Sequence, residues 1–371
     1  MTKANFFDRI QSHYEAELPF VAYNKPNGLN LKGIFQQDNT LYKTFNFSEQ
    51  GFIMSPFDDR QDTILMPLEK SEVVSVPFIV DSLDDFKDVL ISTSEGKSTH
   101  VNLVKKGIEA ISKGKLEKVV LSRSIDVPII QSSFIQMFKN LLSKYPKAFV
   151  YCWYHPKVGL WLGATPETLM HIEGKRFSIM ALAGTQDANN GEKTIWQAKE
   201  KEEQQFVTDF ILKNISPSIE NIKVSDAETS KAGNLLHLKT RIQGTINESC
   251  FNLKSLLQDI HPTPAVCGLP KEEAKQFILE NEDYNREFYT GFLGELNFEK
   301  QIASRSARRN IENRAYTFSK NCTQLYVNLR CAKVETNKAV IFVGGGITEK
   351  SIAEDEWEET VSKSKIIKSV L

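Results

Sequence analysis

The sequence predicts an α+β protein whose core is a large antiparallel β-sheet flanked by helices. Two observations lead to this prediction: segments with strand character outnumber helix candidates, and most consecutive strand segments are joined by short turns. With 371 residues, 41% of them hydrophobic and 25% charged, the chain is long enough to build a sizeable core. No linker divides it, so we expect one domain over residues 1–371.

Each part of the chain contributes elements of one kind or the other. Up to residue 95, short segments of alternating polarity lie between turns, as in strands. Helices are indicated by apolar residues three and four positions apart, such as Val104, Ile108 and Ile111, with Gly114 suited to the end of that helix. The expected elements are a helix over 100–116, a strand over 117–127, hairpins over 148–165 and 168–185, a helix over 194–213, strands over 325–335 and 339–346, and a helix from residue 353 onward.

The segment "HPTPAVCGLP", residues 261–270, is unusual for a surface loop. Three prolines and a glycine exclude a regular helix here. The segment nevertheless contains Ala265 and Val266, apolar residues that are usually kept from water. We therefore expect a rigid apolar loop that leads into a helix beginning near Pro270.

Composition limits the classes of partner. The net charge is −1, so no global field attracts nucleic acid or an anionic membrane. The first twenty residues lack a long apolar region, so we expect no signal peptide, and no apolar run approaches the length of a membrane span. The five cysteines are odd in number and form no CxxC pair, which fits a reducing compartment. We expect a cytoplasmic protein.

A carboxylate lies on the apolar side of the helix over 194–213. Steps of three and four residues back from Phe206 and Val207 reach Glu203, which places it on the buried side or at its edge. One interpretation is a boundary residue whose carboxylate reaches water. The other is a metal ligand, because a buried carboxylate needs a cation or a proton.

The last helix has the same feature. Its apolar face, which includes Ile367, continues backwards through Lys363, Glu359 and Glu356. If these residues were simply charge pairs at the start of an exposed helix, their opposite charges would be explained. It would not be explained why they continue the apolar face that packs on the core. Glu203 and Glu359 could together hold Mg²⁺, a hard cation that prefers oxygen ligands and often needs only one or two carboxylates.

Four further features have a structural and a functional interpretation. Gly344–Gly346 forms a tight turn or gives an anion close access to the backbone. Arg330, within an apolar strand, needs an internal carboxylate or an anionic ligand. Lys118, at a strand start, reaches solvent or acts as a general base. Glu167, after a rigid proline, is an exposed turn residue or a general acid.

These segments, taken in order, resemble the chorismate-utilising enzymes, which include anthranilate, aminodeoxychorismate, salicylate and isochorismate synthases. The resemblance covers about two thirds of the chain, includes little of residues 1–95, and is greatest to the isochorismate synthases. The matching blocks are "KVVLSR" (118–123), "GATPETL" (163–169), "ALAGT" (181–185), "KEKEEQQFV" (199–207), "LLHLKT" (235–240), "HPTPAVCGLP" (261–270), "REFYTGFLG" (286–294), "YVNLRCA" (326–332) and "GGGIT…EWEETVSKSK" (344–365).

The resemblance implies roles for the candidate catalytic and metal-binding residues. Lys118 corresponds to the base that activates water for attack at C2 of chorismate. Glu167 corresponds to the acid that protonates the departing C4 hydroxyl. Glu203 and Glu359 correspond to ligands of Mg²⁺, and Glu356 to one that acts through a water molecule.

It also implies substrate contacts. Residues that correspond to enolpyruvyl-carboxylate contacts are Arg330 and the backbone of Gly344 and Gly346. Lys363 corresponds to a residue near the ring carboxylate. The remaining cavity residues implied by the resemblance are Gly184, Thr185 and His237. At the position of Ala265, relatives that expel pyruvate typically have threonine, so we expect this residue to help set the reaction outcome.

The implied function is that of a Mg²⁺-dependent isomerase. It would convert chorismate reversibly to isochorismate, for menaquinone or siderophore biosynthesis, as a cytoplasmic monomer without nucleic-acid or membrane partners. The alternatives are a salicylate synthase, an anthranilate synthase component I, or a non-catalytic chorismate-binding protein.

The sequence departs from the family pattern at three places. Gln204 follows the metal carboxylate where many relatives have histidine, and "GGGI" replaces a commoner Ala-Gly-Ala-Gly pattern. The strongly basic segment 299–324 is longer than the usual hairpin and would form either an exposed flap or a partner contact.

Overall fold

The computed structural model describes residues 2–78, 95–129, 133–187, 196–232, 235–302 and 318–371. The first sheet consists of β1 (Phe20–Asn24), β2 (Asn30–Gln36), β6 (Ser71–Pro77), β7 (Lys118–Pro128), β8 (Phe149–His155), β9 (Gly159–Thr165), β15 (Gly268–Leu269), β18 (Cys331–Val334) and β19 (Lys338–Ile347). The second sheet consists of β3 (Tyr42–Thr44), β4 (Gly51–Ser55), β5 (Thr63–Pro67), β10 (Thr168–Glu173), β11 (Arg176–Asp187), β12 (Ile219–Val224), β13 (Glu228–Ala232), β14 (Leu235–Ile246), β16 (Phe292–Ile302) and β17 (Phe318–Val327).

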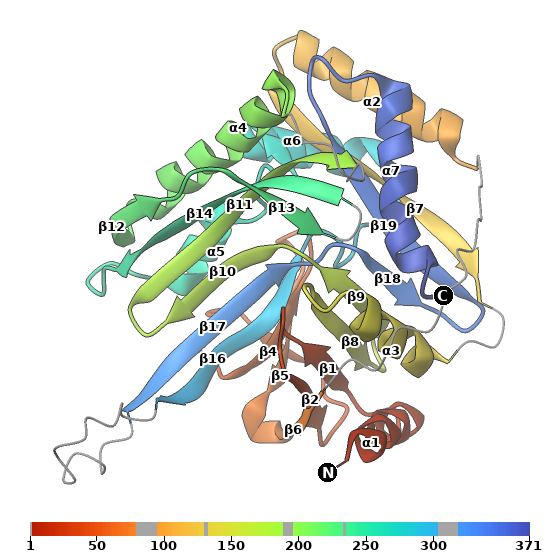
Figure 1. Cartoon of the computed structure of the whole chain (residues 1–371), viewed down its shortest axis with the longest axis vertical. Coiled ribbons are helices and arrows are strands. Elements are labelled where there is room, and N and C mark those ends of the chain that lie inside the picture. Colours follow the sequence, from red (N-terminus) through yellow and green to blue (C-terminus); the bar gives the residue numbers. More distant parts are fainter. Residues whose placement is uncertain (1, 79–94, 130–132, 188–195, 233–234, 303–317) are drawn as a thin grey trace.

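All the described strand pairs are antiparallel, so the predicted fold class is confirmed (Figure 1). The strand order is β15-β7-β19-β18-β9-β8-β1-β2-β6 in the first sheet and β12-β14-β11-β10-β17-β16-β4-β5-β3 in the second, where β13 also pairs with β14. The helices are α1 (Lys3–Glu15), α2 (Lys97–Ser112), α3 (Phe134–Lys144), α4 (Ala198–Ile215), α5 (Leu253–Ile260), α6 (Lys271–Asn281) and α7 (Ala353–Lys368), with a short 3₁₀ helix, η1, at Leu68–Lys70.

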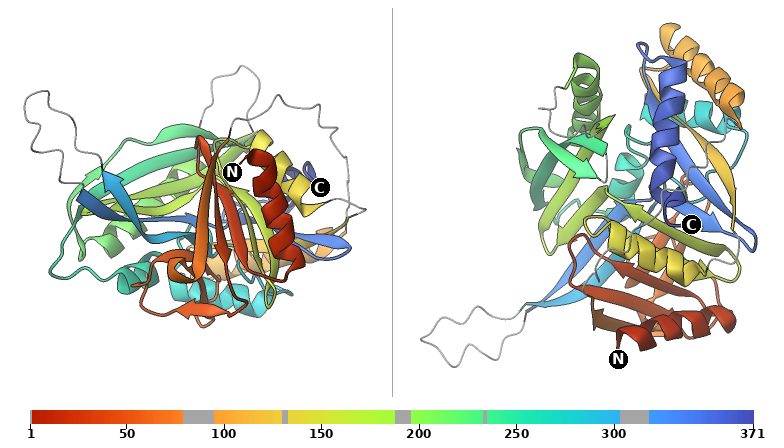
Figure 2. Two further views of the ribbon diagram at one scale, coloured as in Figure 1. Left: turned by 90° about the horizontal axis from the view of Figure 1, so that it is seen from below. Right: turned by 45° about the vertical axis from the view of Figure 1, so that its right-hand side comes forward.

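The two sheets pack against each other, and helices cover their other faces (Figures 1 and 2). The alternation of side chains along a strand explains this arrangement. On β1, Val21 and Tyr23 point into the aromatic core between the sheets, whereas Phe20 and Ala22 belong to the core beneath α1 and α3. Helices α4 and α5 cover the second sheet, and α2, α6 and α7 pack around β7 and β19.

Several predicted elements are confirmed. The two expected hairpins are β8–β9 and β10–β11. In α2, Lys113 follows the last helical residue and Gly114 then adopts a φ of +71°, as expected of a glycine at the end of a helix. The loop over 261–270 is largely buried and leads into α6 directly after Pro270.

Other expectations were wrong. Helix α1 was not predicted; the Thr2 side chain caps it, and it buries Phe6, Phe7 and Ile10. The single strand expected over 325–335 is two strands, β17 and β18, which belong to different sheets. Helix α4 begins at Ala198 rather than at 194, which itself lies outside the described residues.

The basic segment lies partly beyond what the structure covers. Strands β16 and β17 form a hairpin whose described arms end at Ile302 and begin again at Phe318. The question of a flap or partner contact over 303–317 therefore falls outside the described residues. In the described part of the chain, no helix has the length and apolar character needed to cross a bilayer.

Candidate active site

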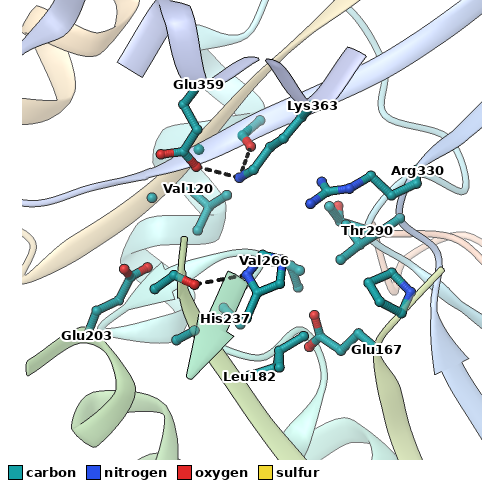
Figure 3. Close-up of a pocket in the computed structure, with 18 of the residues that line it drawn as sticks. Val120, Glu167, Leu182, Glu203, His237, Val266, Thr290, Arg330, Glu359 and Lys363 are labelled. Atoms are coloured by element: carbon teal, nitrogen blue, oxygen red, sulfur yellow. Dashed lines mark hydrogen bonds and ion pairs between the residues drawn. The ribbon is translucent and has the colours of Figure 1, made fainter. Parts of the chain in front are cut away.

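Residues from both sheets and from two helices line one pocket (Figure 3). Strands β7 and β19 contribute from the first sheet, β11 and β14 from the second, and α4 and α7 face each other across it. The lining residues are Val120, Pro166, Glu167, Leu182, Ala183, Gly184, Glu200, Glu203, His237, Ala265, Val266, Tyr289, Thr290, Leu329, Arg330, Gly344, Gly345, Gly346, Glu359 and Lys363.

Lys118 is the first residue of β7 and is completely buried, so the interpretation as a solvent-reaching lysine is wrong. Its Nζ donates a hydrogen bond to Glu203 Oε1 at 2.6 Å. The loop over 261–270 closes against the same strand end: Gly268, with a φ of +145°, pairs with Val119, and a Cβ there would lie 2.3 Å from the Lys118 carbonyl oxygen. Only glycine allows this approach.

The three glycines of β19 are part of a regular strand, so the tight-turn interpretation is wrong. Their missing side chains leave room for carboxylates from two helices. A Cβ on Gly345 would lie 3.3 Å from Glu356 Oε2 and 3.5 Å from Glu359 Oε1, and one on Gly346 would lie 2.7 Å from Glu203 Oε1. Glu203 and Glu359 both line the pocket, whereas Glu356, the third proposed metal ligand, is buried and does not line it.

These carboxylates already have cationic partners. Glu203 pairs with Lys118, and Glu359 Oε1 lies 2.5 Å from Lys363 Nζ. Among the described residues, no group of three or more His, Cys, Asp or Glu side chains has the spacing of a metal site. The two lining carboxylates, Glu203 and Glu359, nevertheless have the chemistry that suits a hard divalent cation, because such a cation prefers oxygen ligands, can keep its own waters and can bind through one or two carboxylates.

Glu167 follows Pro166 in the turn between β9 and β10, and it is buried rather than exposed. Burial raises the pKa of its carboxyl group to about 8, against the opposing influence of Arg330, Lys118 and Lys363. The carboxyl group is therefore mostly protonated at neutral pH and can donate a proton inside the pocket.

Arg330 is not within a strand, as the sequence suggested, but at the bend between β17 and β18. Its backbone has a φ of +50°, a conformation that side-chain-bearing residues rarely adopt. Burial lowers the pKa of the guanidinium. Within the described part of the chain the guanidinium makes no hydrogen bond or ion pair, so it is available to an anionic ligand.

Lys363 extends from α7 toward the same space as Arg330 (Figure 3). Its Nζ donates to the Gly344 carbonyl oxygen at 2.9 Å and pairs with Glu359. Two cationic side chains thus face one pocket, which suits a ligand with more than one carboxylate.

His237 on β14 is buried beside Gly184 of β11. Its Nδ1 donates to the Gly184 carbonyl oxygen at 2.9 Å, since a carbonyl can only accept. Burial lowers the pKa of the imidazole to about 3, so the ring is neutral. Gly184 and Ala265 both line the pocket, whereas the side chain of Thr185 is outside the described part of the structure.

Sequence reasoning missed several lining residues. Glu200 could have been found, because it lies three positions before Glu203 and therefore on the same face of α4. Tyr289 and Thr290 gave no usable signal. Both are buried, and Thr290 has a φ of +60°, a strained conformation for a β-branched residue that cannot be read from its neighbours in sequence.

Comparisons with known proteins agree with this geometry. Residues 80–319 and 315–369 match family descriptions that both read chorismate-binding enzyme. The isochorismate synthase MenF of Pasteurella multocida is 28% identical over 298 residues, or 76% of this chain and 63% of the relative. The vibriobactin-specific isochorismate synthase of Vibrio cholerae is 29% identical over 267 residues, or 68% of this chain and 61% of the relative. The matched region thus spans less than two thirds of each of these relatives.

A solved structure has a similar fold. The menaquinone-specific isochorismate synthase MenF of Escherichia coli superimposes with a TM-score of 0.75 at 20% identity, covering 95% of this chain and 88% of that one.

Proposed function

Because the chain belongs to the family of chorismate-binding enzymes, we propose that it is an isochorismate synthase, which converts chorismate reversibly to isochorismate. One observation supports this proposal above the others. Buried Lys118 is hydrogen-bonded to Glu203 of the pocket lining, and the same lining contains the buried, protonated Glu167 and Arg330, which has no partner among the described residues. A base, an acid and an anion-binding group are what an exchange of hydroxyl positions on a dicarboxylate requires.

In the proposed reaction, Lys118 Nζ removes a proton from a water molecule whose oxygen bonds to C2 of the substrate. The ring double bonds shift, and the bond from C4 to its hydroxyl oxygen breaks. Glu167 donates its proton to that oxygen, which leaves as water. In the reverse direction the two residues exchange the roles of acid and base.

The cationic side chains bind the substrate. Arg330 pairs with the enolpyruvyl carboxylate, beside the backbone of Gly344 and Gly346, and Lys363 lies near the ring carboxylate. His237, being neutral, offers a hydrogen bond without adding charge. Binding both carboxylates orients C2 toward Lys118 and C4 toward Glu167. Holding the reacting groups in this orientation lowers the entropic part of the activation barrier.

We further propose that Glu203 and Glu359 hold Mg²⁺, with Glu356 acting through a water molecule. When bound, the ion would supply positive charge next to the ring carboxylate and help to orient it. In support, Glu203 and Glu359 line the same pocket, and each lies beside a glycine of β19, Gly346 and Gly345 respectively.

A product assay tests the function. Purified protein is incubated with chorismate and Mg²⁺, and the products are separated by chromatography. Isochorismate is the expected product. Salicylate with pyruvate would identify a salicylate synthase, anthranilate formed with ammonia would identify an anthranilate synthase, and unchanged chorismate would indicate a binding protein.

Removal of the metal tests the Mg²⁺ proposal. Turnover should disappear in EDTA and return with added Mg²⁺; full activity in EDTA would refute the metal proposal.

Ala265 offers a test of reaction outcome. It lines the pocket on the rigid loop, and in pyruvate-expelling relatives the resemblance places threonine there. We expect Ala265→Thr to shift the product ratio from isochorismate toward pyruvate release, with Ala265→Ser separating the effect of the hydroxyl from that of the methyl. An unchanged product profile in both variants would remove this explanation.

A further inference from the structure

A buried ion pair lies behind the pocket wall without lining it. Glu282 directly follows α6, and Arg286 is four residues further along the chain. Their side chains are only 1% and 2% exposed. Arg286 Nε and Nη2 donate to Glu282 Oε2 and Oε1 at 2.7 and 2.6 Å, which is the bidentate geometry of a strong arginine–carboxylate pair.

Every N–H group of Arg286 is used. The Nη1 group donates to the Val266 carbonyl oxygen at 3.1 Å and to Thr290 Oγ1 at 3.2 Å, and Nη2 also donates to the Val120 carbonyl oxygen at 2.7 Å. Glu282 Oε1 in turn accepts from the backbone N and the Oγ of Ser122, both at 2.8 Å. A lysine has three donors on one atom and could not reproduce this pattern.

Three of the residues that accept hydrogen bonds from Arg286 line the pocket, and they belong to three of its walls. Val120 lies two residues after Lys118 on β7, so both side chains point to the same face of the strand. Val266 neighbours Ala265 on the proline-rich loop, and Thr290 is in the strained turn before β16. Strand β7 and the proline-rich loop are far apart in sequence, Thr290 is four residues from Arg286, and Arg286 contacts all three.

We propose that Glu282 and Arg286 are positioning residues, which fix the strand that contains Lys118 relative to the loop and the turn that close the pocket. This inference rests on the proposed function. Neither residue lines the pocket, and the N–H groups of Arg286 are all taken up by protein acceptors, so we assign neither residue a contact with the substrate. Their effect on the reaction comes from the placement of the base, for which a displacement of about 1 Å can lower the rate roughly 100-fold.

Two conservative variants test the proposal without leaving a buried charge unpaired. Arg286→Lys keeps the positive charge but loses the planar guanidinium with its five N–H donors. Glu282→Asp keeps the negative charge, but the shorter side chain draws the guanidinium away from the carbonyl oxygens of Val120 and Val266. In both, we expect kcat for isochorismate formation to fall about tenfold or more, with KM changed less than about threefold, because misplacing the base affects the transition state more than binding. Circular dichroism confirms folding at the assay temperature.

Glu295→Asp is the matched control. Glu295 is also a buried carboxylate with cationic partners, Lys25 and Lys32, but it does not line the pocket. We expect this variant to have a lower melting temperature and a kcat within about twofold of the wild type. A purely structural defect reduces the amount of folded enzyme but not the turnover rate of each folded molecule.

The wild type, assayed alongside, separates the two proposals. If the wild type forms isochorismate and folded Arg286→Lys and Glu282→Asp match its kcat, the positioning role is overturned and the proposed function stands. A fall in kcat for all three variants, in proportion to their loss of stability, would also overturn it. Absence of turnover by the wild type would overturn the proposed function, and the positioning role with it.

Discussion

Glu167 has a protonation state unlike that of an ordinary surface carboxylate. Its usual pKa of 4.5 rises to about 8, because the cost of burying a negative charge outweighs the attraction of three neighbouring cations. At pH 7 the acid form predominates. A proton donor is thus available without any neighbouring histidine in its acidic form, since His237 is neutral.

We expect Glu167→Gln to lower kcat by about 10²–10⁴-fold, because it removes the proton for the departing hydroxyl. In the wild type, forward turnover should fall as the pH rises above about 8, where Glu167 loses that proton. Initial rates of isochorismate formation between pH 6 and 9.5 check both points. A variant with wild-type kcat, or a wild-type rate that rises steadily to pH 9.5, would contradict the assignment.

The same pKa shift predicts a change in stability. Because the pKa of Glu167 is raised in the folded state, its contribution to stability is fully present below pH 4.5 and is lost as the pH rises through about 8. Glu167→Gln should therefore gain stability relative to the wild type on going from pH 5 to pH 9. Urea unfolding at both values measures this difference; a constant difference would show that Glu167 is charged in the folded protein.

Arg330 is suited to carboxylate binding by its fork of donors and by its lack of a partner in the described structure. We expect Arg330→Lys to raise KM for chorismate about 10- to 100-fold, because the lysine keeps the charge but not the bidentate contact. Steady-state kinetics provide the measurement. Arg9→Lys, which alters a surface ion pair with Glu72, is the control and should behave like the wild type; equal KM values for the two variants would exclude Arg330 from binding.

At the scale of elements, β19 has glycine at the positions that carboxylates from helices α4 and α7 approach. A strand that carried side chains at 344–346 would keep the helices apart. The space is tightest at Gly346, where a Cβ would lie 2.7 Å from Glu203 Oε1 and 3.1 Å from Lys118 Cε. This glycine is needed for close approach rather than for its own conformation, because its φ is not positive.

We therefore expect Gly346→Ala to lower kcat about 100-fold by displacing the Lys118–Glu203 pair, while the melting temperature changes little. Gly107→Ala on α2 is the matched control: its Cβ would meet the flexible tip of Leu121 at 2.9 Å, away from the pocket. Product assays and thermal unfolding of both variants check the prediction. An active Gly346→Ala enzyme, or one that is merely unfolded, would contradict it.

At the scale of the whole molecule, a buried polar cluster ties the two sheets together. Glu295 on β16 accepts from Tyr23 on β1 and pairs with Lys25 and with Lys32 on β2. The neighbouring lysines and the Tyr23 hydroxyl overcome the effect of burial and lower the pKa of Glu295 to about 2.

Breaking this cluster should destabilise the protein in a pH-dependent manner. At pH 7 we expect Glu295→Gln to lower the free energy of unfolding by about 1–3 kcal/mol, because two partly exposed lysines lose hydrogen bonds to a buried carboxylate. The lowered pKa means that the carboxylate's contribution is present above its usual pKa of 4.5 and is lost as the pH falls toward 2. The difference from the wild type should thus shrink between pH 5 and 3 in urea unfolding; a difference that does not change would argue against a paired carboxylate.

The sequence by itself determined the local elements and several site residues. Hairpin positions, the end of α2 and the break at 261–270 depend on residues close together in the chain, so periodicity, glycine and proline sufficed. Helical spacing also placed Glu203 and Glu359 on inward faces. The catalytic and metal-binding roles rest on the family resemblance and stay predictions.

Only the tertiary structure decided which charged residues are buried and what surrounds them. Arg330 reads as part of one strand, yet the chain crosses between sheets there, because each half pairs with strands distant in sequence. The three glycines of β19 were compatible with a turn in the sequence. In the structure they form a strand that pairs with β7 and is approached by side chains of α4 and α7. Burial of Glu167 and the contacts of Arg286 likewise depend on segments brought together by folding. The environment of a charged group is set by its neighbours in three dimensions, which the order of residues in the chain does not reveal.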